Sequence, residues 1–311
     1  LEYNSYVKNG WIGVGWSLDM GAIQRSTKKG LNCAGDDYVF TKGGLAMELT
    51  SRATDWGQGY YGAKIEEKFT KFYHDPTGGW TATSTDGTTY YFGIATDGDS
   101  LQPCDGGTFK WYLDKVQDAN GNYMEMDYLK SSGQVYLKEI RYTGHDNAPV
   151  LDPSIRVVFR LPGIREDKIL SYESHQAVTT SRLLKSIEIL AKNEQYIEER
   201  VGAYELSYEM SSTNKSVLTS VRQIGEDGQS TIVFNQDGSV SGGVSLPANT
   251  MQYSETSREW GCLGDINSID LSSFQFFDTR YYLNYKVIVS GNFNGDQKTD
   301  IIISPVYYAP E

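Results

Sequence analysis

Hydrophobic and polar residues alternate along most of this 311-residue chain. The stretches 124–128, 155–161 and 204–210 place apolar side chains at alternate positions with charged or polar ones between them, as in "YELSYEM". Successive side chains of a strand point to opposite faces of a sheet, so this period of two predicts strands with one apolar face.

Turn-forming residues separate these stretches at short intervals. They form the segments "DPTGG" (75–79), "TDG" (85–87), "ANGN" (119–122), "KSSG" (130–133) and "NQDG" (235–238). Asp-Gly and Asn-Gly pairs supply the backbone conformations that tight hairpins need. The pattern therefore predicts an all-β fold, an antiparallel meander of long hairpins.

One segment also fits a helix. Residues 183–200 contain good helix formers, but Ile187 and Ile189 alternate with polar neighbours, and "KNEQ" (192–195) is a plausible turn. We favour a hairpin here.

Composition agrees with a sheet-rich fold. The chain has 23 tyrosines and 32 glycines but only 8 prolines, and 39% of its residues are hydrophobic. Aromatic side chains suit a pleated, half-buried surface, and the apolar content is sufficient for a core. Periodicity is weakest over 236–262, so we predict one domain over 1–245, followed by a linker and a second element over 246–311.

The net charge of −12 argues against binding to nucleic acid or to anionic membranes. No apolar stretch approaches membrane-spanning length, so we expect no membrane insertion by this segment. Cys33, Cys104 and Cys262 are far apart and form no CxxC pair, which excludes a zinc knuckle. We favour three thiols, with one disulfide left open.

The segment "GNFNGDQKTDIIIS" (291–304) resembles a calcium-binding loop before a strand. Its candidate oxygen ligands are Asn292, Asn294, Asp296 and Asp300, and Gly295 permits the sharp bend. The loop lacks the length and terminal glutamate of an EF-hand. Alternatively, the same side chains cap the loop's own backbone amides. Calcium is the only cofactor that the sequence predicts.

Catalytic patterns are weak. His74, His145 and His175 are isolated and lie in turn-like segments, so we expect them to be exposed in loops. No GxSxG elbow occurs, and "GWSLD" (15–19) lacks its second glycine. With 40 acidic residues, some pair of carboxylates will always lie at the separation that a glycosidase needs, so the sequence alone leaves hydrolysis open. We predict that the chain is not an enzyme.

Several stretches, in order, resemble the SpvB-type domain of the B components of bacterial Tc insecticidal toxin complexes and of the Salmonella virulence plasmid B protein. The opening "LEYNSYVKNGWIGVGWSLDMGAIQRSTKKG" is similar to the family's signature. Similarity continues through "DDYVFTKGGLAMEL", "FKWYLDKVQDANGNYMEMDY" and "TSRLLKSIEI", over roughly the first 235 residues. The matching signature residues, to which we assign structural roles, are Gly13, Gly15, Trp16, Ser17, Leu18, Arg25 and Gly30.

This resemblance implies part of a large, hollow β-shell that encloses a toxic C-terminal segment. The implied partners are other parts of the same polypeptide, a C-type Rhs component related to YD repeats, and a pore-forming A component. The family is bacterial and secreted. Its SpvB-type region precedes FG-GAP/VCBS repeats of a β-propeller, and "NFNGDQKTDIII" resembles the first of these, with Asn292 where the family usually has Asp. A solitary loop suggests a truncated propeller.

Two other functions stay open. A secreted, calcium-dependent adhesin or ligand-binding β module would use the same loop within tandem repeats. A secreted hydrolase would need a carboxylate pair with raised pKa values beside an aromatic groove. Missing neighbouring strands would also leave an open sheet edge, which predicts self-association.

Overall fold

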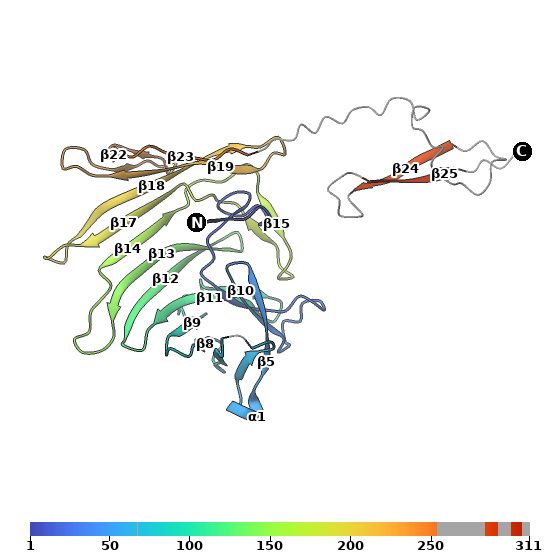
Figure 1. The fold of residues 1–311 in the computed structure, drawn as a ribbon, viewed down its shortest axis with the longest axis horizontal. Helices are drawn as coiled ribbons and strands as arrows, with labels where there is room; N and C mark the ends of the chain where they lie inside the picture. The colour runs from blue at the N-terminus through green and yellow to red at the C-terminus, as the bar shows by residue number, and fades with distance from the viewer. Residues whose placement is uncertain (67, 254–283, 292–299, 307–311) are drawn as a thin grey trace, which may run out of the picture. The chain divides into compact units, whose positions relative to one another are not determined.

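The computed structural model describes residues 1–66, 68–253, 284–291 and 300–306. Contacts divide the chain into two compact units, residues 1–257 and 258–311. The sequence predicted a boundary at residue 245 between an SpvB-like domain and the linker to a propeller, and this boundary stays a prediction. Strands dominate the described residues, which confirms the all-β expectation (Figure 1).

A closed barrel forms the first part of unit 1. Each of its strands pairs with the next in antiparallel fashion, and the last strand pairs with both the first and the seventh. In chain order the strands are β3 (Ala22–Arg25), β4 (Tyr38–Lys42), β5 (Leu45–Ser51), β6 (Tyr60–Ala63), β7 (Lys71–His74), β8 (Trp80–Thr83), β9 (Thr89–Phe92) and β11 (Gly107–Gln117). The short helix α1 (Ala53–Trp56) connects β5 to β6, and β10 (Leu101–Cys104) pairs with the start of β11.

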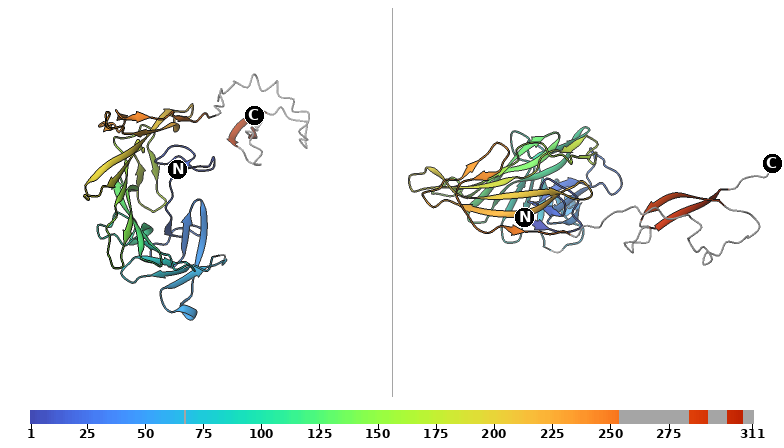
Figure 2. Two further views of the ribbon diagram at one scale, coloured as in Figure 1. Left: turned by 60° about the vertical axis from the view of Figure 1, so that its left-hand side comes forward. Right: turned by 90° about the horizontal axis from the view of Figure 1, so that it is seen from above.

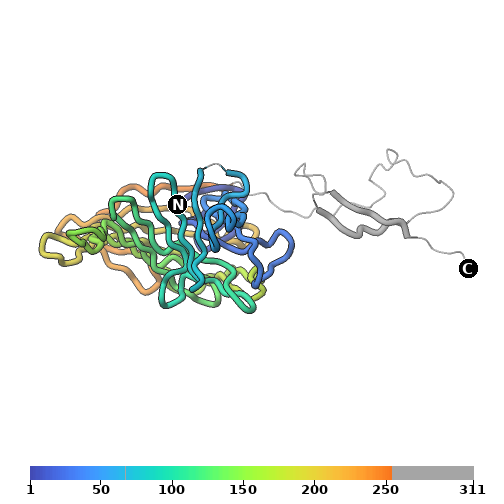
Figure 3. Tube along the Cα trace, turned by 90° about the horizontal axis from the view of Figure 1, so that it is seen from below, coloured from blue at the N-terminus to red at the C-terminus, as the bar shows by residue number. Residues whose placement is uncertain are grey.

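An open antiparallel sheet continues from the barrel (Figures 1 and 2). Its strands lie in the order β12 (Asn122–Ser131), β13 (Gln134–His145), β14 (Ile155–Arg160), β17 (Ser186–Lys192), β18 (Glu198–Met210) and β19 (Ser216–Gly225). The short strands β22 (Val244–Ser245) and β23 (Asn249–Thr250) both pair with β19. The hairpins of this unit follow one another side by side, as the Cα trace shows (Figure 3).

Three short two-stranded pairings accompany the large sheet. They are β1 (Glu2–Tyr3) with β2 (Trp16–Ser17), β15 (Ile169–Ser171) with β16 (Val178–Thr180), and β20 (Val233–Phe234) with β21 (Val240–Ser241). In unit 2 the described residues form one antiparallel pair, β24 (Asn284–Gly291) with β25 (Asp300–Val306). The strand expected at Ile301–Ile303 is therefore present.

Strand β11 belongs to both the barrel and the open sheet. Residues 110–112 pair with β3, residues 113–117 pair with β9, and residues 115–117 also pair with β12. The register shifts between Leu113 and Lys115, which marks a bulge at Asp114. Bulges bend a strand and increase its twist, so this one lies where β11 passes from the ring into the sheet.

The predicted turns are confirmed. The five turn segments join β7 to β8, β8 to β9, β11 to β12, β12 to β13, and β20 to β21. In the third of these, the Gly121 amide donates to the Asp118 carbonyl at 3.1 Å. Residues 186–210 form β17 and β18, so the hairpin interpretation is confirmed and the helical alternative is wrong.

The apolar core runs through both parts of unit 1. In the barrel, Phe72, Trp80, Phe92 and Trp111 are each no more than 2% exposed, and the ring of Tyr38 lies 4.7 Å from that of Trp80 at 75°. Such edge-to-face contacts stabilise aromatic clusters beyond area burial alone. The same core cluster continues into the sheet through fully buried side chains such as Tyr136, Leu184 and Leu218.

Two expectations about single residues were wrong. Cys33 and Cys104 form a disulfide with their Cα atoms 6.2 Å apart, although 71 residues separate them. Sequence spacing alone could not show this proximity, which the fold creates by placing the segment before β4 beside β10. His74 lies at the end of β7, stacked on Trp80 with ring centroids 4.4 Å apart, rather than in an exposed loop. Cys262 lies outside the described residues.

Candidate functional site

Residues 9–18, which we call the signature segment, lie across the apolar face of the open sheet. The Leu184 amide donates to the Trp11 carbonyl at 2.9 Å, and the Val14 amide donates to the Ser216 carbonyl at 3.0 Å. The Trp11 ring meets Phe159 edge-on at 6.5 Å between centroids. An open sheet cannot bury a face by closing on itself, so this segment provides the missing cover.

Gly13 and Gly15 allow this close approach. Both have positive φ angles, +96° and +79°. A Cβ atom on Gly13 would lie 2.9 Å from the Ser216 carbonyl oxygen, and one on Gly15 would lie 2.6 Å from the ring of Tyr3. Only glycine meets both the backbone and the steric requirement at these positions.

Trp16, Ser17 and Leu18 attach the end of the segment to the sheet. Trp16 Nε1 donates to the Tyr253 hydroxyl at 2.8 Å, which donates to the Leu218 carbonyl at 2.6 Å. Ser17 pairs with Glu2 in the β1–β2 ladder, and Leu18 packs on the main core. The structure thus places these three residues in one packed layer.

Arg25 and Gly30 lie apart from that layer. Arg25 is 8% exposed inside the barrel, where its Nε donates to the Thr108 carbonyl at 2.7 Å and its guanidinium lies 5.3 Å from the centre of the Tyr38 ring. Gly30 closes a turn by donating to the Thr27 carbonyl at 3.1 Å. The seven signature residues therefore form no single site.

A buried ion pair, which the sequence did not reveal, fixes the signature segment in place. Arg165 donates from Nε to Asp167 Oδ1 at 2.8 Å, and their side chains are 0% and 4% exposed. Arg165 also donates to the Gly10 carbonyl at 2.6 Å and to Asn9 Oδ1 at 2.9 Å. The Ser216 amide donates to Asp167 Oδ2 at 2.7 Å. We call these five residues the Arg165 clasp.

The Arg165 clasp joins three distant parts of the chain: the N-terminal segment, the loop after β14 and the start of β19. Burial alone would raise the pKa of Asp167, but hydrogen bonds from Arg165, Ser216 and Asn9 outweigh it and hold that pKa well below its usual range. A buried pair of this kind is expensive to break, because removing one partner leaves an uncompensated charge.

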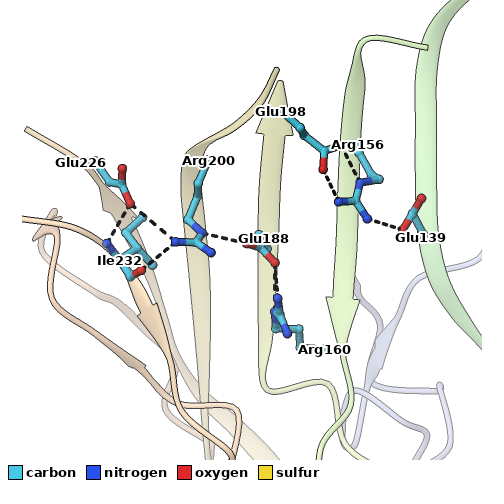
Figure 4. A network of polar contacts seen from close by, with 8 residues as sticks. All are labelled: Glu139, Arg156, Arg160, Glu188, Glu198, Arg200, Glu226 and Ile232. Carbon is cyan, nitrogen blue, oxygen red and sulfur yellow. Dashed lines mark hydrogen bonds and ion pairs between the residues drawn. The ribbon is translucent and has the colours of Figure 1, made fainter. Parts of the chain in front are cut away.

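The opposite face of the open sheet carries a ladder of charged side chains (Figure 4). Glu188, only 4% exposed, accepts hydrogen bonds from Arg160 at 3.1 Å and from Arg200 at 2.7 Å. Arg156 donates to Glu139 at 3.1 Å and to Glu198 at 2.9 Å. These side chains alternate with core residues along their strands, so they lie on the face away from the signature segment.

The charged groups of this ladder bind other groups of the same chain. Arg200 also donates to the Ile232 carbonyl at 2.8 Å, and the Ile232 amide donates to Glu226 at 2.8 Å (Figure 4). The ladder therefore holds the loop before β20 against the sheet. The charged groups of the ladder neutralise one another. This arrangement suits a structural surface in contact with solvent better than a catalytic centre.

Candidate catalytic and metal-binding groups do not converge in the described part of the chain. No cluster of three or more His, Cys, Asp or Glu there could hold a metal ion. Burial and the nearby charge of Arg25 lower the pKa of His74, which keeps it neutral within the aromatic core. His145 lies at the end of β13 beside Asn122, and His175 lies in an exposed turn, as expected for the latter.

Asp114, at the bulge of β11, has a carboxyl group with a raised pKa. Burial raises it to about 6, against hydrogen bonds from the Ile94 amide at 2.6 Å and the Ser100 hydroxyl at 3.1 Å. The side chain holds the loop after β9 to the bulge of β11. Asp114 is 6% exposed, and its two hydrogen-bond donors, the Ile94 amide and the Ser100 hydroxyl, belong to the loop that it holds. We therefore assign Asp114 a structural role.

The predicted calcium loop lies almost wholly outside the described residues. This applies to Asn292, Asn294 and Asp296, while Asp300 begins β25 and pairs with Gly291. Calcium binding stays a prediction. No helix among the described residues is long and apolar enough to span a membrane.

Comparison with known proteins gives one family match. The family model described as Salmonella virulence plasmid 65kDa B protein (SpvB) matches residues 1–148. No curated protein matches the sequence.

Solved structures show the same fold. The N-terminal domain of effector protein SpvB from Salmonella typhimurium strain LT2 is 16% identical, with a TM-score of 0.62 over 72% of this chain and 92% of that one. A chain of the TcdB2-TccC3 crystal structure is 18% identical, with a TM-score of 0.61 over 92% of this chain and 16% of its own. A chain of the Photorhabdus luminescens Tc holotoxin pore is 19% identical, with a TM-score of 0.62 over 81% and 14%. This chain thus spans only 14–16% of the length of these Tc toxin chains.

Proposed function

We propose a structural role that starts from one identification: residues 1–148 form a domain of the SpvB family. In this proposal the chain is a non-catalytic part of the wall of a Tc-toxin B-like shell. The shell would enclose a toxic segment and dock to a pore-forming A component. A C-type Rhs component and the rest of the chain's own polypeptide would complete it.

One observation carries the proposal. The shared fold covers 92% of this chain within the TcdB2-TccC3 structure, so both the barrel and the open sheet have counterparts in a toxin assembly. The physical features agree with a wall. One face of the sheet is covered by the chain's own signature segment, and the other carries charges that pair with one another. The paired charges of the ladder therefore need no substrate to neutralise them.

Three further points belong to the proposal. Secretion follows from the family alone. The second unit would begin a propeller whose loop binds calcium through Asn292, Asn294, Asp296 and Asp300. The absence of catalysis is supported by the structural roles that we assign to Asp114 and His74.

The test is co-expression of the polypeptide that contains this chain with a C-type Rhs component. We expect a stoichiometric complex, isolated by gel filtration, in which the toxic segment resists added protease. Leu218→Asp, which places a charge in the core of the sheet, should abolish the complex, whereas Val244→Asp, at a 52% exposed position, should not. A polypeptide that binds calcium and a carbohydrate but no C-type component would instead support the adhesin and overturn the shell.

A further inference from the structure

One end of the barrel is open and apolar. Two adjoining hollows of about 530 and 450 Å³ lie there, between the tip of the β4–β5 hairpin and residues 64–66 and 68–70. They share Phe40, Lys42, Met47 and Lys68 as lining residues. Phe40 is opposite Met47 in the ladder, so one face of the hairpin supplies much of this wall.

The floor of the smaller hollow is the barrel interior itself. Phe72, Ala82 and Phe92 line the smaller hollow and are each no more than 2% exposed. Other interior side chains, Tyr38, Trp80 and Trp111, pack on one another and line neither hollow. An eight-stranded barrel is just wide enough to be filled by side chains or to hold one small ligand. This barrel is filled in one region and hollow in another.

Large apolar side chains stand around the opening. Leu45, Ile65 and Phe69 are 74%, 78% and 70% exposed. Single exposed apolar residues are ordinary on protein surfaces, but a group around a hollow marks a binding site. These three side chains extend the apolar floor outward to solvent.

Lysines complete the rim. Lys28, Lys42, Lys64 and Lys68 line the larger hollow, although the chain as a whole carries a net charge of −12. Glu48 pairs with Lys28 and Lys64, each at 2.7 Å. Within the described residues, Lys42 and Lys68 take part in no ion pair. Glu66 and Asp86 line the smaller hollow, so the excess of positive charge lies at the larger one, where four lysines and one glutamate are found. Such a concentration of positive charge beside apolar side chains attracts anions with an apolar body.

We propose that this end of the barrel binds one molecule of a linear amphiphilic anion, such as a medium-chain carboxylate. Its apolar chain would lie over Phe40 and Met47, and its charged group would meet the ammonium groups of Lys42 and Lys68. The hollows fall within the range of about 300–1,000 Å³ usual for small-molecule sites, and the buried rings of Phe72 and Phe92 close the smaller one below. A small ligand fits this depth better than a flat protein surface does.

Isothermal titration of the full chain with sodium dodecanoate below its micellar concentration tests the proposal. We expect saturable binding of one molecule, with 1-dodecanol binding at least about tenfold more weakly because it lacks the charge. Lys42→Glu and Ile65→Asp should each weaken dodecanoate binding by about tenfold or more. Both positions are near the surface, and an unchanged near-UV circular dichroism spectrum would confirm that the variants fold.

The matched controls are Lys138→Glu and Leu170→Asp. Lys138 is exposed on β13, and Leu170 is 56% exposed on β15, both outside the barrel, so neither change should alter the affinity. Binding that is unsaturable, or equal in all variants, would overturn the proposal. So would a folded chain that binds an acidic, leucine-rich peptide but not dodecanoate, since the opening would then serve a protein partner. The experiment does not depend on shell assembly, so the two proposals can fail separately.

Discussion

The barrel and the open sheet bury apolar surface in different ways. The barrel closes through β11, so its strands surround a core of aromatic rings. The open sheet has one apolar face that only a separate segment can cover, and residues 9–18 do so. The stability of the barrel therefore depends on side-chain packing. The covering of the open sheet also depends on the long-range hydrogen bonds and the ion pair of the Arg165 clasp. Four changes test this difference.

Trp80→Ala should have the largest effect. The side chain is 0% exposed, and Nε1 has no hydrogen-bond partner among the described atoms, so packing alone is lost. We expect the free energy of unfolding to fall by about 3–5 kcal/mol. Because one core cluster spans barrel and sheet, urea unfolding followed by circular dichroism should stay a single transition. Two separate transitions would mean that the regions unfold independently.

Arg165→Ala should lower the free energy of unfolding by about 3–5 kcal/mol at pH 7, because it leaves the buried charge of Asp167 without its partner. The pKa of Asp167 is lowered in the folded state, so the stability from the clasp is full above the unfolded value near 3.8 and is lost as the pH falls below it. Urea unfolding at pH 7 and pH 3 should therefore differ less in the variant than in the parent chain.

The matched control for that change is Arg141→Ala. This arginine is 39% exposed and pairs with Asp127 at 3.1 Å on the charged face. Its loss should cost less than about 1 kcal/mol. Equal losses for Arg165→Ala and Arg141→Ala would show that the clasp is no more important than a surface pair.

Asp114→Asn should change the pH dependence in the opposite direction. The pKa of Asp114 is raised to about 6, so between pH 4 and 6 the folded chain keeps a proton that the unfolded chain releases. Its contribution to stability therefore falls by up to about 3 kcal/mol as the pH rises through this window. The variant should lack this fall in urea titrations at pH 4 and pH 7. An unchanged pH profile would mean that Asp114 is ionised throughout.

Arg156→Met should have the smallest effect. Arg156 and its partner Glu198 are both 34% exposed, so solvent and salt weaken their attraction. The other partner of Arg156, Glu139, keeps Arg141 within 3.8 Å. We expect a loss below about 1 kcal/mol that disappears in 1 M NaCl, measured beside Lys138→Met on the neighbouring strand. A loss of several kcal/mol would place the charged ladder with the clasp as a main support of the sheet.

Periodicity and turn chemistry determined most of the secondary structure from sequence. The alternation in 204–210 predicted β18, and "ANGN" predicted the turn from β11 to β12, because side-chain direction and turn geometry are local properties. The opening motif led to the SpvB-type family, whose model matches residues 1–148. The structural roles assigned to the signature residues stay a prediction, and nothing in the sequence indicated what these residues contact.

Only the tertiary structure decided how distant segments meet. The pairing of β11 with β3, β9 and β12, the Cys33–Cys104 disulfide and the contact of Asn9 with Arg165 all join residues far apart in the chain. Such pairings depend on closure and on the path of the whole chain, which local patterns do not contain. His74 illustrates the limit: its neighbours in sequence are typical of a turn, but the barrel surrounds its ring with Trp80, Trp111 and Tyr38.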